Sequence, residues 1–420
     1  MANGINRVCV VGLGYVGLPT AAILAGRGVE VIGVDIDSNR VDTVNAGRSP
    51  FDEPGLDSLV ADAVSAGTLS ARGDPTQADV FIVAVPTPVS ANRSPDLSYV
   101  HTAVDSLAHV LRKGNLVIVE STCPVGTTEK VCAGLASARP DLTFPHSAGE
   151  ASDIRVAYCA ERILPGNALD ELVENDRVIG GVSPACAEAA KRLYEMFVEG
   201  VCHSTCVRTA ELSKLAENAF RDVNVAFANE MSLVCKALGV DPWDMIGLAN
   251  RHPRVEILNP GPGVGGHCIP VDPWFIADAA PHLTPLVQAA RLVNDGMPKV
   301  IADNVIAECE GLDNPVVACL GLAYKADTAD LRESPAIEVV KHLQKRMNGR
   351  ILVVEPFVTE LPPDIDSKGT TKLIALDEGL AAADVVVLLT DHSVFADISR
   401  ESLAPKSVVD SRGLWQPQRA

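Results

Sequence analysis

Basic residues are scarce in this sequence relative to acidic ones. The 420 residues include 35 Lys and Arg against 54 Asp and Glu, which gives a net charge of −19 and a pI near 4.9. Such a field repels nucleic acids and acidic membrane surfaces, so we expect neither as a partner. A small anionic ligand is still allowed, because local arginines and lysines can outweigh the global charge.

The sequence also lacks a second cysteine pair that could complete a metal site. Its 11 cysteines are scattered, and their odd number favours reduced thiols in a cytosol over disulfides. Only Cys202-His203-Ser204-Thr205-Cys206 has ligand-like spacing, and alone it is interpreted as structural. The apolar N-terminal run contains glycines and lacks a basic segment beyond Arg7, so it does not predict a signal peptide. We therefore expect a cytoplasmic protein without a bound metal.

The composition is that of a globular protein with more than one domain. Hydrophobic residues make up 47% of the chain and charged residues 21%. A chain of this length is too long for one ordinary core, so two or three domains are expected.

The N-terminal segment has the pattern of a dinucleotide site. The apolar run Val8-Cys9-Val10-Val11 predicts a buried strand, and Gly12-Leu13-Gly14-Tyr15-Val16-Gly17 follows it before a helical pattern. A second predicted strand, Val29 to Val34, ends in Asp35. Glycines allow the pyrophosphate to approach a helix N-terminus, and the acid can bind both ribose hydroxyls. The pattern favours NAD over NADP, although Arg40 lies close enough to keep NADP open.

Three threonines follow the next predicted strands. Val80–Val85 precedes Thr87, and Leu116–Glu120 precedes Thr122 and Thr128. The carboxyl ends of strands line the ligand crevice of a doubly wound sheet, so these threonines suit cofactor or substrate contacts. Their alternative role is plain helix capping.

Two more predicted strands complete the first domain. Ala157–Arg162 ends in the charged residues Glu161 and Arg162, and Arg177–Gly181 is expected to be the last strand before the domain closes near residue 205.

A long helix is predicted from Thr209, as N-cap, to Leu238. Lys214, Asn218 and Arg221/Asp222 form one polar stripe on it. This stripe is either a solvated face or a functional one. Long central helices also serve as dimer surfaces in two-domain dehydrogenases, so an oligomer is expected.

The segment from Asn259 to Phe275 is predicted to be a shaped loop, because it contains four glycines and several prolines. Such a backbone can approach an anionic group closely. Cys268 follows the glycines, and Asp272 lies four residues later, one turn away if the chain becomes helical there. The pattern suggests a substrate loop that ends in a nucleophile; the alternative is a tight turn with a buried thiol.

The C-terminal segment predicts a second α/β domain. After a helix over Arg291–Glu310, strands are expected at Val316–Gly321, Ile351–Val354, Val385–Leu389 and Ser407–Asp410. Lys325 and Arg332, just past a strand end, suit a phosphate-bearing ligand. We thus predict an α/β protein of two Rossmann-like doubly wound domains, joined by a long central helix and a helical middle domain. The expected boundaries are 1–204, 205–308 and 309–420.

In their order along the chain, these motifs resemble the nucleotide-sugar 6-dehydrogenase family over essentially the whole length. The elements that carry the resemblance are Gly12-x-Gly14-x-x-Gly17, Thr87, Ser121-Thr122, Glu161, Lys214 with Asn218, Gly265-Gly266-His267-Cys268 with Asp272, and Lys325 with Arg332. The resemblance implies oxidation of a sugar C6 alcohol to a carboxylate with two NAD, in a homodimer or higher oligomer that binds a UDP-sugar.

The resemblance also implies roles for individual residues. Lys214 and Asn218 would bind the C6 oxygen, Cys268 would form a thiohemiacetal and then a thioester, and water near Thr122, Asp272 and Glu161 would hydrolyse it. The expected cofactor contacts are Gly12, Gly14, Tyr15, Val16, Gly17, Asp35, Arg40, Thr87, Thr122, Thr128 and Arg332. The expected substrate contacts are Arg162, Ile163, Lys214, Asn218, Arg221, His252, Arg254, Gly265, Lys325 and Arg412.

Within the family the likeness is to the branch that acts on UDP-N-acetyl-D-mannosamine. Val271 and Pro165 stand where the UDP-glucose branch has a lysine and a second glutamate, which leaves the group that assists thioester hydrolysis open. UDP-N-acetylglucosamine and UDP-glucose are the alternative substrates. A two-electron hydroxyacid dehydrogenase, which needs no nucleophilic cysteine, and a non-catalytic nucleotide-binding protein are more distant alternatives.

Overall fold

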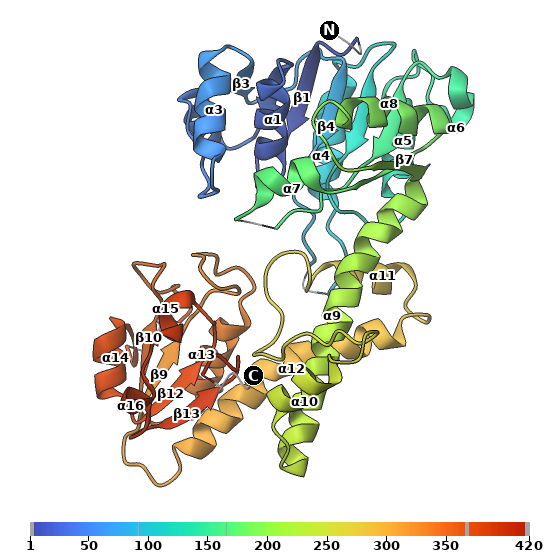
Figure 1. The fold of residues 1–420 in the computed structure, drawn as a ribbon. Coiled ribbons are helices and arrows are strands. Elements are labelled where there is room, and N and C mark those ends of the chain that lie inside the picture. Colours follow the sequence, from blue (N-terminus) through green and yellow to red (C-terminus); the bar gives the residue numbers. More distant parts are fainter. Residues whose placement is uncertain (1–3, 91, 165, 366–368, 416–420) are drawn as a thin grey trace. The chain divides into compact units, whose positions relative to one another are not determined.

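The computed structural model describes residues 4–90, 92–164, 166–365 and 369–415. The chain forms two compact units (Figure 1). Unit 1 comprises Met1–Glu217 with Trp274–Ala279, and unit 2 comprises Asn218–Pro273 with Ala280–Ala420. Each unit contains one sheet flanked by helices, and the two sheets confirm the predicted fold class of two Rossmann-like domains.

The sheet of unit 1 has eight strands in the order β3-β2-β1-β4-β5-β6-β7-β8. The first six strands of this order, from β3 through β1 to β6, are parallel and have the order typical of dinucleotide-binding domains. Strand β7 is antiparallel to β6, and β8 is parallel to β7. The strands are β1 (Arg7–Val11), β2 (Glu30–Val34), β3 (Leu69–Arg72), β4 (Val80–Val83), β5 (Leu116–Val119), β6 (Arg155–Tyr158), β7 (Arg177–Gly181) and β8 (Cys202–Cys206).

Helices cover both faces of this sheet, which explains why its central strands are continuous apolar runs. Val8 and Val10 of β1 pack on the side of α1, α3 and α8, whereas Cys9 and Val11 pack on the side of α4 and α5. The helices are α1 (Gly17–Gly26), α2 (Ser38–Asn45), α3 (Leu56–Ser65), α4 (Ser98–Ala108), α5 (Thr127–Ala138), α6 (Pro145–Ala148), η1 (Gly149–Ala151), α7 (Ala168–Glu174) and α8 (Pro184–Tyr194).

The end of this domain differs from the sequence-based prediction in two respects. Arg177–Gly181 is not the last strand, because the polar run Cys202–Cys206 forms β8 at the edge of the sheet. Thr209 is not an N-cap, because α9 already begins at Val207. An edge strand needs few apolar side chains, so hydrophobic patterning did not identify β8.

One helix continues from unit 1 into unit 2. Helix α9 (Val207–Leu238) has 32 residues, and Lys214 and Asn218 lie one turn apart on it. The helices that follow it are α10 (Pro242–Ala249), α11 (Asp272–Ala279) and α12 (Pro285–Glu308).

The sheet of unit 2 is entirely parallel, with the order β11-β10-β9-β12-β13. This order repeats that of β3-β2-β1-β4-β5 in unit 1. Its strands are β9 (Val316–Leu320), β10 (Arg350–Val354), β11 (Thr371–Leu373), β12 (Val385–Leu388) and β13 (Ser407–Asp410), and its helices are α13 (Pro335–Arg346), α14 (Leu376–Ala382), α15 (Ser393–Ala396) and α16 (Arg400–Leu403).

The turn after the first strand of each sheet is built in the same way. Gly12 follows β1 with φ 96° and Gly321 follows β9 with φ 91°, a conformation that favours glycine. The next residue's N–H donates to an acid at the end of the neighbouring strand, at 2.9 Å from Leu13 to Asp35 and 2.6 Å from Leu322 to Glu355. Both turns therefore lie at the point where the strand order reverses, which is where ligands bind in such sheets.

Candidate active site

The three glycines after β1 have different surroundings. A Cβ added at Gly12 would lie 2.5 Å from the Ala84 carbonyl oxygen, and one at Gly17 would lie 1.9 Å from the Gly12 carbonyl oxygen. Both glycines are thus required by the packing of the turn. A Cβ at Gly14 would meet nothing within 4 Å, so open space lies beside that backbone. The turn fits a dinucleotide, because it leaves room for a pyrophosphate where the helix begins.

The acid of the predicted dinucleotide site is buried and held in place. Asp35 accepts the Leu13 N–H, and its Oδ2 also lies 2.9 Å from Arg40 Nη1. The Arg40 guanidinium stacks over Phe51, with 5.5 Å to the ring centroid, and Tyr15 contacts the same ring at 4.2 Å. The structure therefore brings Tyr15, Asp35 and Arg40 together at the end of β2. Arg40 neutralises Asp35 here, whereas a 2′-phosphate site would need that guanidinium for the ligand.

The threonines after β4 and β5 form hydrogen bonds within unit 1. Thr87 Oγ1 donates to the Thr122 carbonyl at 2.7 Å, which joins the two strand ends. Thr128 is fully buried, and its hydroxyl donates to Glu211 at 2.7 Å. Glu211, which sequence reasoning did not identify, thus holds the first turn of α5. A cofactor contact by Thr128 stays a prediction.

Lys214 and Glu161 face each other inside unit 1. Lys214 Nζ lies 3.8 Å from Glu161 Oε1, and both side chains are at most 10% exposed. The other Glu161 oxygen accepts the Ile163 N–H at 2.6 Å. The pair is a pre-positioned ammonium and carboxylate, which suits proton transfer. Arg162, which follows Glu161, does not join this pair but forms an ion pair with Glu217.

A second carboxyl group lies buried behind this pair at the end of β5. Glu120 is 1% exposed and accepts the Tyr194 hydroxyl at 3.1 Å. Burial raises its pKa to about 7, although Arg177 and the Tyr194 hydrogen bond act in the opposite direction. Glu161 is among the charges that raise it. Sequence reasoning assigned Glu120 no role, although a carboxylate that ends an apolar strand is a signal for one.

Three of the predicted catalytic residues are brought together within unit 2. Asn218 Nδ2 donates to Asp272 Oδ2 at 2.6 Å, and the Asp272 N–H donates to the Cys268 carbonyl at 2.9 Å. The Cys268 and Asp272 backbones are thus one helical turn apart, as predicted, and α11 begins at Asp272. A half-buried thiol and a buried carboxylate that is oriented by an amide form a plausible nucleophile site.

The glycines before Cys268 approach other parts of unit 2. An added Cβ would lie 2.5 Å from Arg412 Nη1 at Gly261, 2.9 Å from the Asn294 carbonyl oxygen at Gly263, and 2.6 Å from Tyr324 Cβ at Gly265. The sequence suggested that these glycines bring backbone N–H groups to a ligand. The Gly261 N–H instead donates to Asn229 Oδ1 at 2.8 Å and the Gly266 N–H to the Arg332 carbonyl at 3.2 Å. The glycines therefore allow the loop to pack closely against other parts of unit 2.

The polar stripe of α9 is largely buried. Lys214 and Asp222 are both buried, whereas Arg221 is exposed. Asp222 Oδ1 accepts from Arg291 Nη1 at 2.6 Å and from Asn294 Nδ2 at 2.8 Å. This buried network joins α9 to α12, so a purely solvated face is ruled out for the stripe.

Two other predicted site residues of unit 2 pair with acidic side chains. Arg412 Nε donates to Asp391 Oδ1 at 2.9 Å, and Arg332 pairs with Asp330 through its Nε at 2.8 Å. The side chains that remain largely open to solvent are Arg221, His252 and Arg254, whereas Lys325 is half-buried. Pro165 lies outside the described residues.

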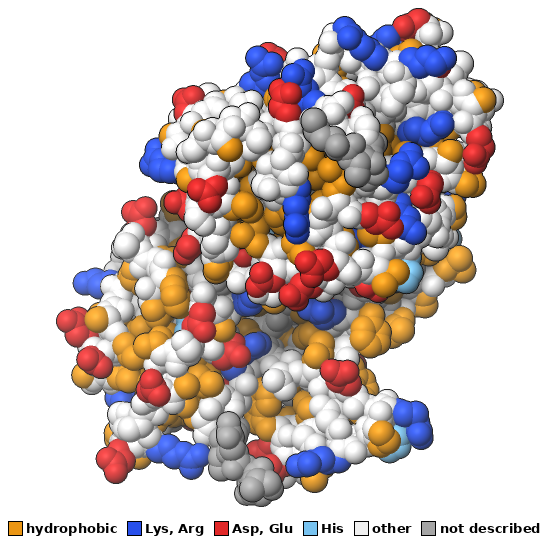
Figure 2. Space-filling model, turned by 45° about the horizontal axis from the view of Figure 1, so that its top comes forward, with side chains coloured by type: hydrophobic (Ala, Val, Ile, Leu, Met, Phe, Trp, Pro, Cys, Tyr) orange, Lys and Arg blue, Asp and Glu red, His pale blue; other side chains and the backbone are white. Residues whose placement is uncertain are grey.

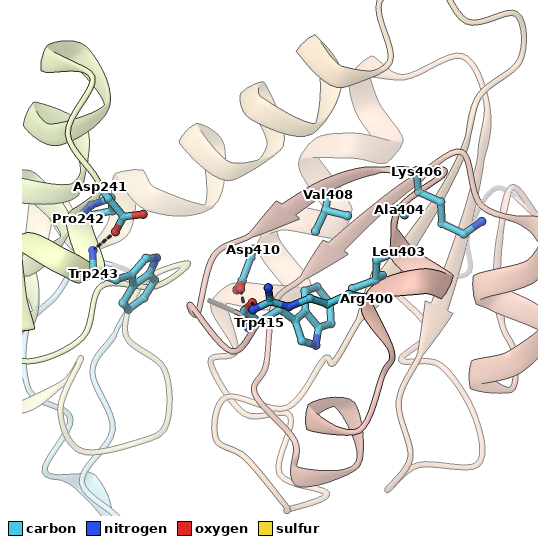
Figure 3. Close-up of a pocket in the computed structure, with 10 residues that line it drawn as sticks. All are labelled: Asp241, Pro242, Trp243, Arg400, Leu403, Ala404, Lys406, Val408, Asp410 and Trp415. Atoms are coloured by element: carbon cyan, nitrogen blue, oxygen red, sulfur yellow. Dashed lines mark hydrogen bonds between the residues drawn. The ribbon is translucent and has the colours of Figure 1, made fainter. Parts of the chain in front are cut away.

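A pocket lies in unit 2 close to Arg412, whose N–H donates to Asp410 in the pocket wall at 3.0 Å. It measures about 660 Å³, and its wall includes Trp243, Arg400 and Trp415. In Figure 3 Asp241 and Trp243 form one side, and Arg400 and Trp415 the other. None of its ten lining residues belongs to the expected site.

Neither one sign of charge nor a metal-binding cluster dominates the surface that Figure 2 draws or the described side chains. Figure 2 shows acidic and basic side chains interspersed over the face that it draws. Among the described residues, no group of three or more His, Cys, Asp or Glu is arranged to hold a metal ion. None of the helices in the described part of the chain is both long and apolar enough to cross a membrane.

Three consecutive parts of the chain match models of one protein family. Residues 6–198 match the NAD binding domain of the UDP-glucose/GDP-mannose dehydrogenase family, residues 208–296 its central domain, and residues 318–417 its UDP binding domain.

Individual relatives are similar over almost their full length. An NDP-N-acetyl-D-galactosaminuronic acid dehydrogenase of Ralstonia nicotianae is 54% identical over 414 residues, which are 99% of this chain and 97% of the relative. A UDP-N-acetyl-D-mannosamine dehydrogenase of Campylobacter jejuni is 52% identical over 402 residues, 96% of this chain and 99% of the relative. Among solved structures, a UDP-D-ManNAc dehydrogenase of Pyrococcus horikoshii matches with a TM-score of 0.88 and 37% identity, covering 99% of this chain and 97% of that one.

Proposed function

Because the chain belongs to the UDP-glucose/GDP-mannose dehydrogenase family, an NAD-dependent family of nucleotide-sugar dehydrogenases, we propose that it oxidises UDP-N-acetyl-D-mannosamine at C6 to the corresponding uronate. The observation that carries this substrate is that two of the three relatives described above, at 52% and 37% identity over nearly the full length of both chains, are UDP-N-acetyl-D-mannosamine dehydrogenases. The arrangement of Cys268, Asp272 and Asn218 supports a reaction that needs a nucleophile. Each conversion removes four electrons and consumes one water.

NAD fits the turn after β1, and bound NAD would accept the hydride in each of the two oxidations. The space at Gly14 would take the pyrophosphate, and Asp35 would accept hydrogen bonds from ribose hydroxyls. Tyr15 and Val16 lie in the same turn and would line the site. Because the Arg40 guanidinium is paired with Asp35 and is thus not available to a 2′-phosphate, NADP is disfavoured.

In the first oxidation the C6 hydroxyl loses a proton as a hydride leaves the carbon. Lys214, acting as a base in its amine form, would take up this proton, and Glu161 would stabilise the ammonium that results. Asn218 would add a hydrogen bond to the C6 oxygen. The product of this step is a C6 aldehyde.

The second oxidation needs Cys268. Its sulfur would add to the aldehyde carbon, which gives a thiohemiacetal, and loss of a hydride from that carbon gives a thioester. Water then adds to the thioester and the thiol leaves, so the cysteine is regenerated and the sugar becomes a carboxylate. Asp272 and Thr122, with Glu161, would orient this water. A covalent intermediate also keeps the aldehyde from escaping.

The UDP moiety would be bound by unit 2. The end of β9 carries Lys325, and the end of β13 carries Arg412, both suited to phosphate oxygens. Arg162, Ile163, Arg221, His252, Arg254 and Gly265 are proposed sugar or diphosphate contacts, and Arg332 and Thr128 are proposed cofactor contacts.

An alternative substrate has one specific observation in its favour. The Ralstonia nicotianae relative, 54% identical to this chain, is named for an N-acetyl-D-galactosaminuronic acid. UDP-N-acetyl-D-galactosamine carries the same 2-acetamido group and differs in stereochemistry. The chemistry at Cys268 would be unchanged, because the reacting carbon is again C6.

The test is the number of NADH formed per sugar consumed. We expect two NADH per UDP-N-acetyl-D-mannosamine, and no comparable turnover of UDP-N-acetyl-D-glucosamine, UDP-N-acetyl-D-galactosamine or UDP-glucose under the same conditions. One NADH per sugar would remove the thioester from the mechanism. Two NADH per sugar with a different substrate would keep the mechanism and refute the substrate.

We also propose that the protein is a cytoplasmic homodimer joined through α9. Phe220, Phe227 and Val234 recur every seven residues on this helix, and Leu238 extends the same face. They are 71%, 48%, 40% and 72% exposed in the single chain. An apolar seam repeated at heptad spacing suits a second copy of the same helix, because a symmetric contact would cover both seams at once.

We further propose that the chain divides into three domains, with boundaries after residues 204 and 308.

A further inference from the structure

Tyr324 packs directly on the two glycines that precede His267 and Cys268. A Cβ at Gly265 would lie 2.6 Å from Tyr324 Cβ and 2.8 Å from the Glu333 carbonyl oxygen. A Cβ at Gly266 would lie 2.9 Å from Tyr324 Cε2, on the aromatic ring. No side chain fits at either position without displacing the tyrosine or the backbone. The cysteine loop is thus pressed against one aromatic side chain.

The Gly265–Gly266 segment is also held by the backbone of Arg332. The Gly266 N–H donates to the Arg332 carbonyl at 3.2 Å, and Glu333 next to it has φ 48°, a strained conformation for a non-glycine residue. The Tyr324 N–H donates to the Asp330 carbonyl at 3.2 Å, which folds the segment back on itself. Both ends of residues 324–333 therefore contact Gly265 and Gly266.

Tyr324 belongs to the ligand-binding edge of the second sheet. It follows β9, three residues after Gly321, at the point where the strand order reverses between β9 and β12. The Thr390 hydroxyl, from the end of β12, donates to the carbonyl of Ala323 at 2.6 Å, so the residue before Tyr324 is fixed by the neighbouring strand. Lys325 follows immediately. A ligand at this edge would therefore lie beside the segment that carries the tyrosine.

We propose that Tyr324 is a positioning residue that couples nucleotide occupation of this edge to the placement of Cys268. The coupling rests on the proposed function, since it takes UDP as the nucleotide and Cys268 as the nucleophile. Its physical basis is the close packing on glycine: the space between the Tyr324 side chain and the Gly265–Gly266 backbone is too small for a Cβ, so a shift of the ring toward the loop would move that backbone, and Cys268 lies two residues further on. A misplacement of a reacting group by about 1 Å costs roughly 10²-fold in rate.

The test measures the rate at which iodoacetamide alkylates Cys268, with and without saturating UDP. The Cys268 peptide is quantified by mass spectrometry, so that the exposed Cys206 is followed separately as an internal control. In the wild-type chain UDP is expected to slow alkylation of Cys268 by about 5-fold or more, the lower range of coupling between two sites, and to leave Cys206 unchanged. Calorimetry establishes that UDP is bound under the same conditions.

Two variants separate coupling from simple shielding by UDP. Y324A removes the ring, and G266A displaces the loop from the ring without changing the edge itself. Both are expected to bring the UDP effect on Cys268 below about 2-fold while UDP still binds, whereas Y324F keeps the ring and the full effect. In Y324A we expect kcat to fall by roughly 10²-fold with a much smaller change in KM for the sugar.

The outcomes are distinguishable. If UDP binds the wild-type chain and leaves Cys268 alkylation unchanged, the coupling is wrong and the proposed function stands. If Y324A and G266A both keep the wild-type UDP effect, the effect is shielding and the coupling is again wrong. If the wild-type chain does not bind UDP at all, the proposed function is wrong and the coupling fails with it.

Discussion

Replacing Glu120 by glutamine should change how the stability of unit 1 depends on pH. Burial raises the pKa of this carboxyl from its ordinary 4.5 to about 7, against the opposing effects of Arg177 and Tyr194. A carboxyl group whose pKa is higher in the folded state favours folding while it is protonated. That contribution is fully present below the unfolded pKa of 4.5 and is lost as the pH rises through about 7.

The size of the effect follows from the shift. Each unit of pKa corresponds to about 1.4 kcal/mol, so the full change between acid and alkaline limits is about 3 kcal/mol, and about 2 kcal/mol of it falls between about pH 5.5 and 8. The glutamine in E120Q is always neutral and can still accept the Tyr194 hydroxyl. Relative to wild type, the free energy of unfolding of E120Q should therefore rise by about 2 kcal/mol across this pH range. This corresponds to a rise of roughly 4–8 °C in the unfolding temperature of a unit of this size.

Differential scanning calorimetry across this pH range measures the effect as the difference in Tm between E120Q and wild type. Taking the difference removes the titration of all other groups. E30Q, which changes an exposed glutamate of the same unit, is the matched control and should show a constant difference. A Tm difference for E120Q that stays constant with pH would refute the reasoning, because it would mean that Glu120 titrates alike in the folded and unfolded chains.

Four further substitutions test the site and the assembly. C268S should lower four-electron turnover by roughly 10³-fold or more, because the sugar can no longer pass through a thioester, and product analysis should find no uronate. N218A should lower kcat by roughly 10²-fold through loss of one hydrogen bond to the C6 oxygen, read from initial rates at saturating sugar; an unchanged kcat would remove Asn218 from the mechanism. D35A should raise KM for NAD about 10-fold with kcat nearly unchanged, since one or two hydrogen bonds to ribose are lost. F227K should convert the proposed dimer to a monomer in light scattering, and a persistent dimer would place the interface elsewhere.

The sequence was most informative where structure is local. The apolar runs at Val8–Val11 and Val316–Leu320 predicted buried parallel strands correctly, because such strands are covered on both faces and need no partner information. The spacing of Cys268 and Asp272 likewise predicted a helical turn, which the Asp272 N–H completes.

Features that depend on distant contacts were not predictable in this way. The polar edge strand β8 has no hydrophobic pattern, and its pairing with β7 is tertiary. The sequence suggests that the glycines of the cysteine loop approach an anionic group, but an added Cβ at Gly261, Gly263 or Gly265 would meet Arg412, Asn294 or Tyr324, which lie far away in sequence. The buried pairing of Asp222 with Arg291 spans 69 residues, and nothing in either local segment indicates it.

The likeness between the turns after β1 and β9 includes one carboxylate in each sheet. Both turns have a glycine with positive φ after the first strand, and a carboxylate at the neighbouring strand end, Asp35 or Glu355, accepts the next N–H. The two carboxylates differ in their other partners. In the second sheet Glu355 Oε2 lies 3.0 Å from the fully buried His392 Nε2, so this carboxylate is closed off from a ribose. His392 therefore holds the Glu355 carboxylate inside the second sheet, where that carboxylate accepts the N–H groups of Leu322 and Ala323.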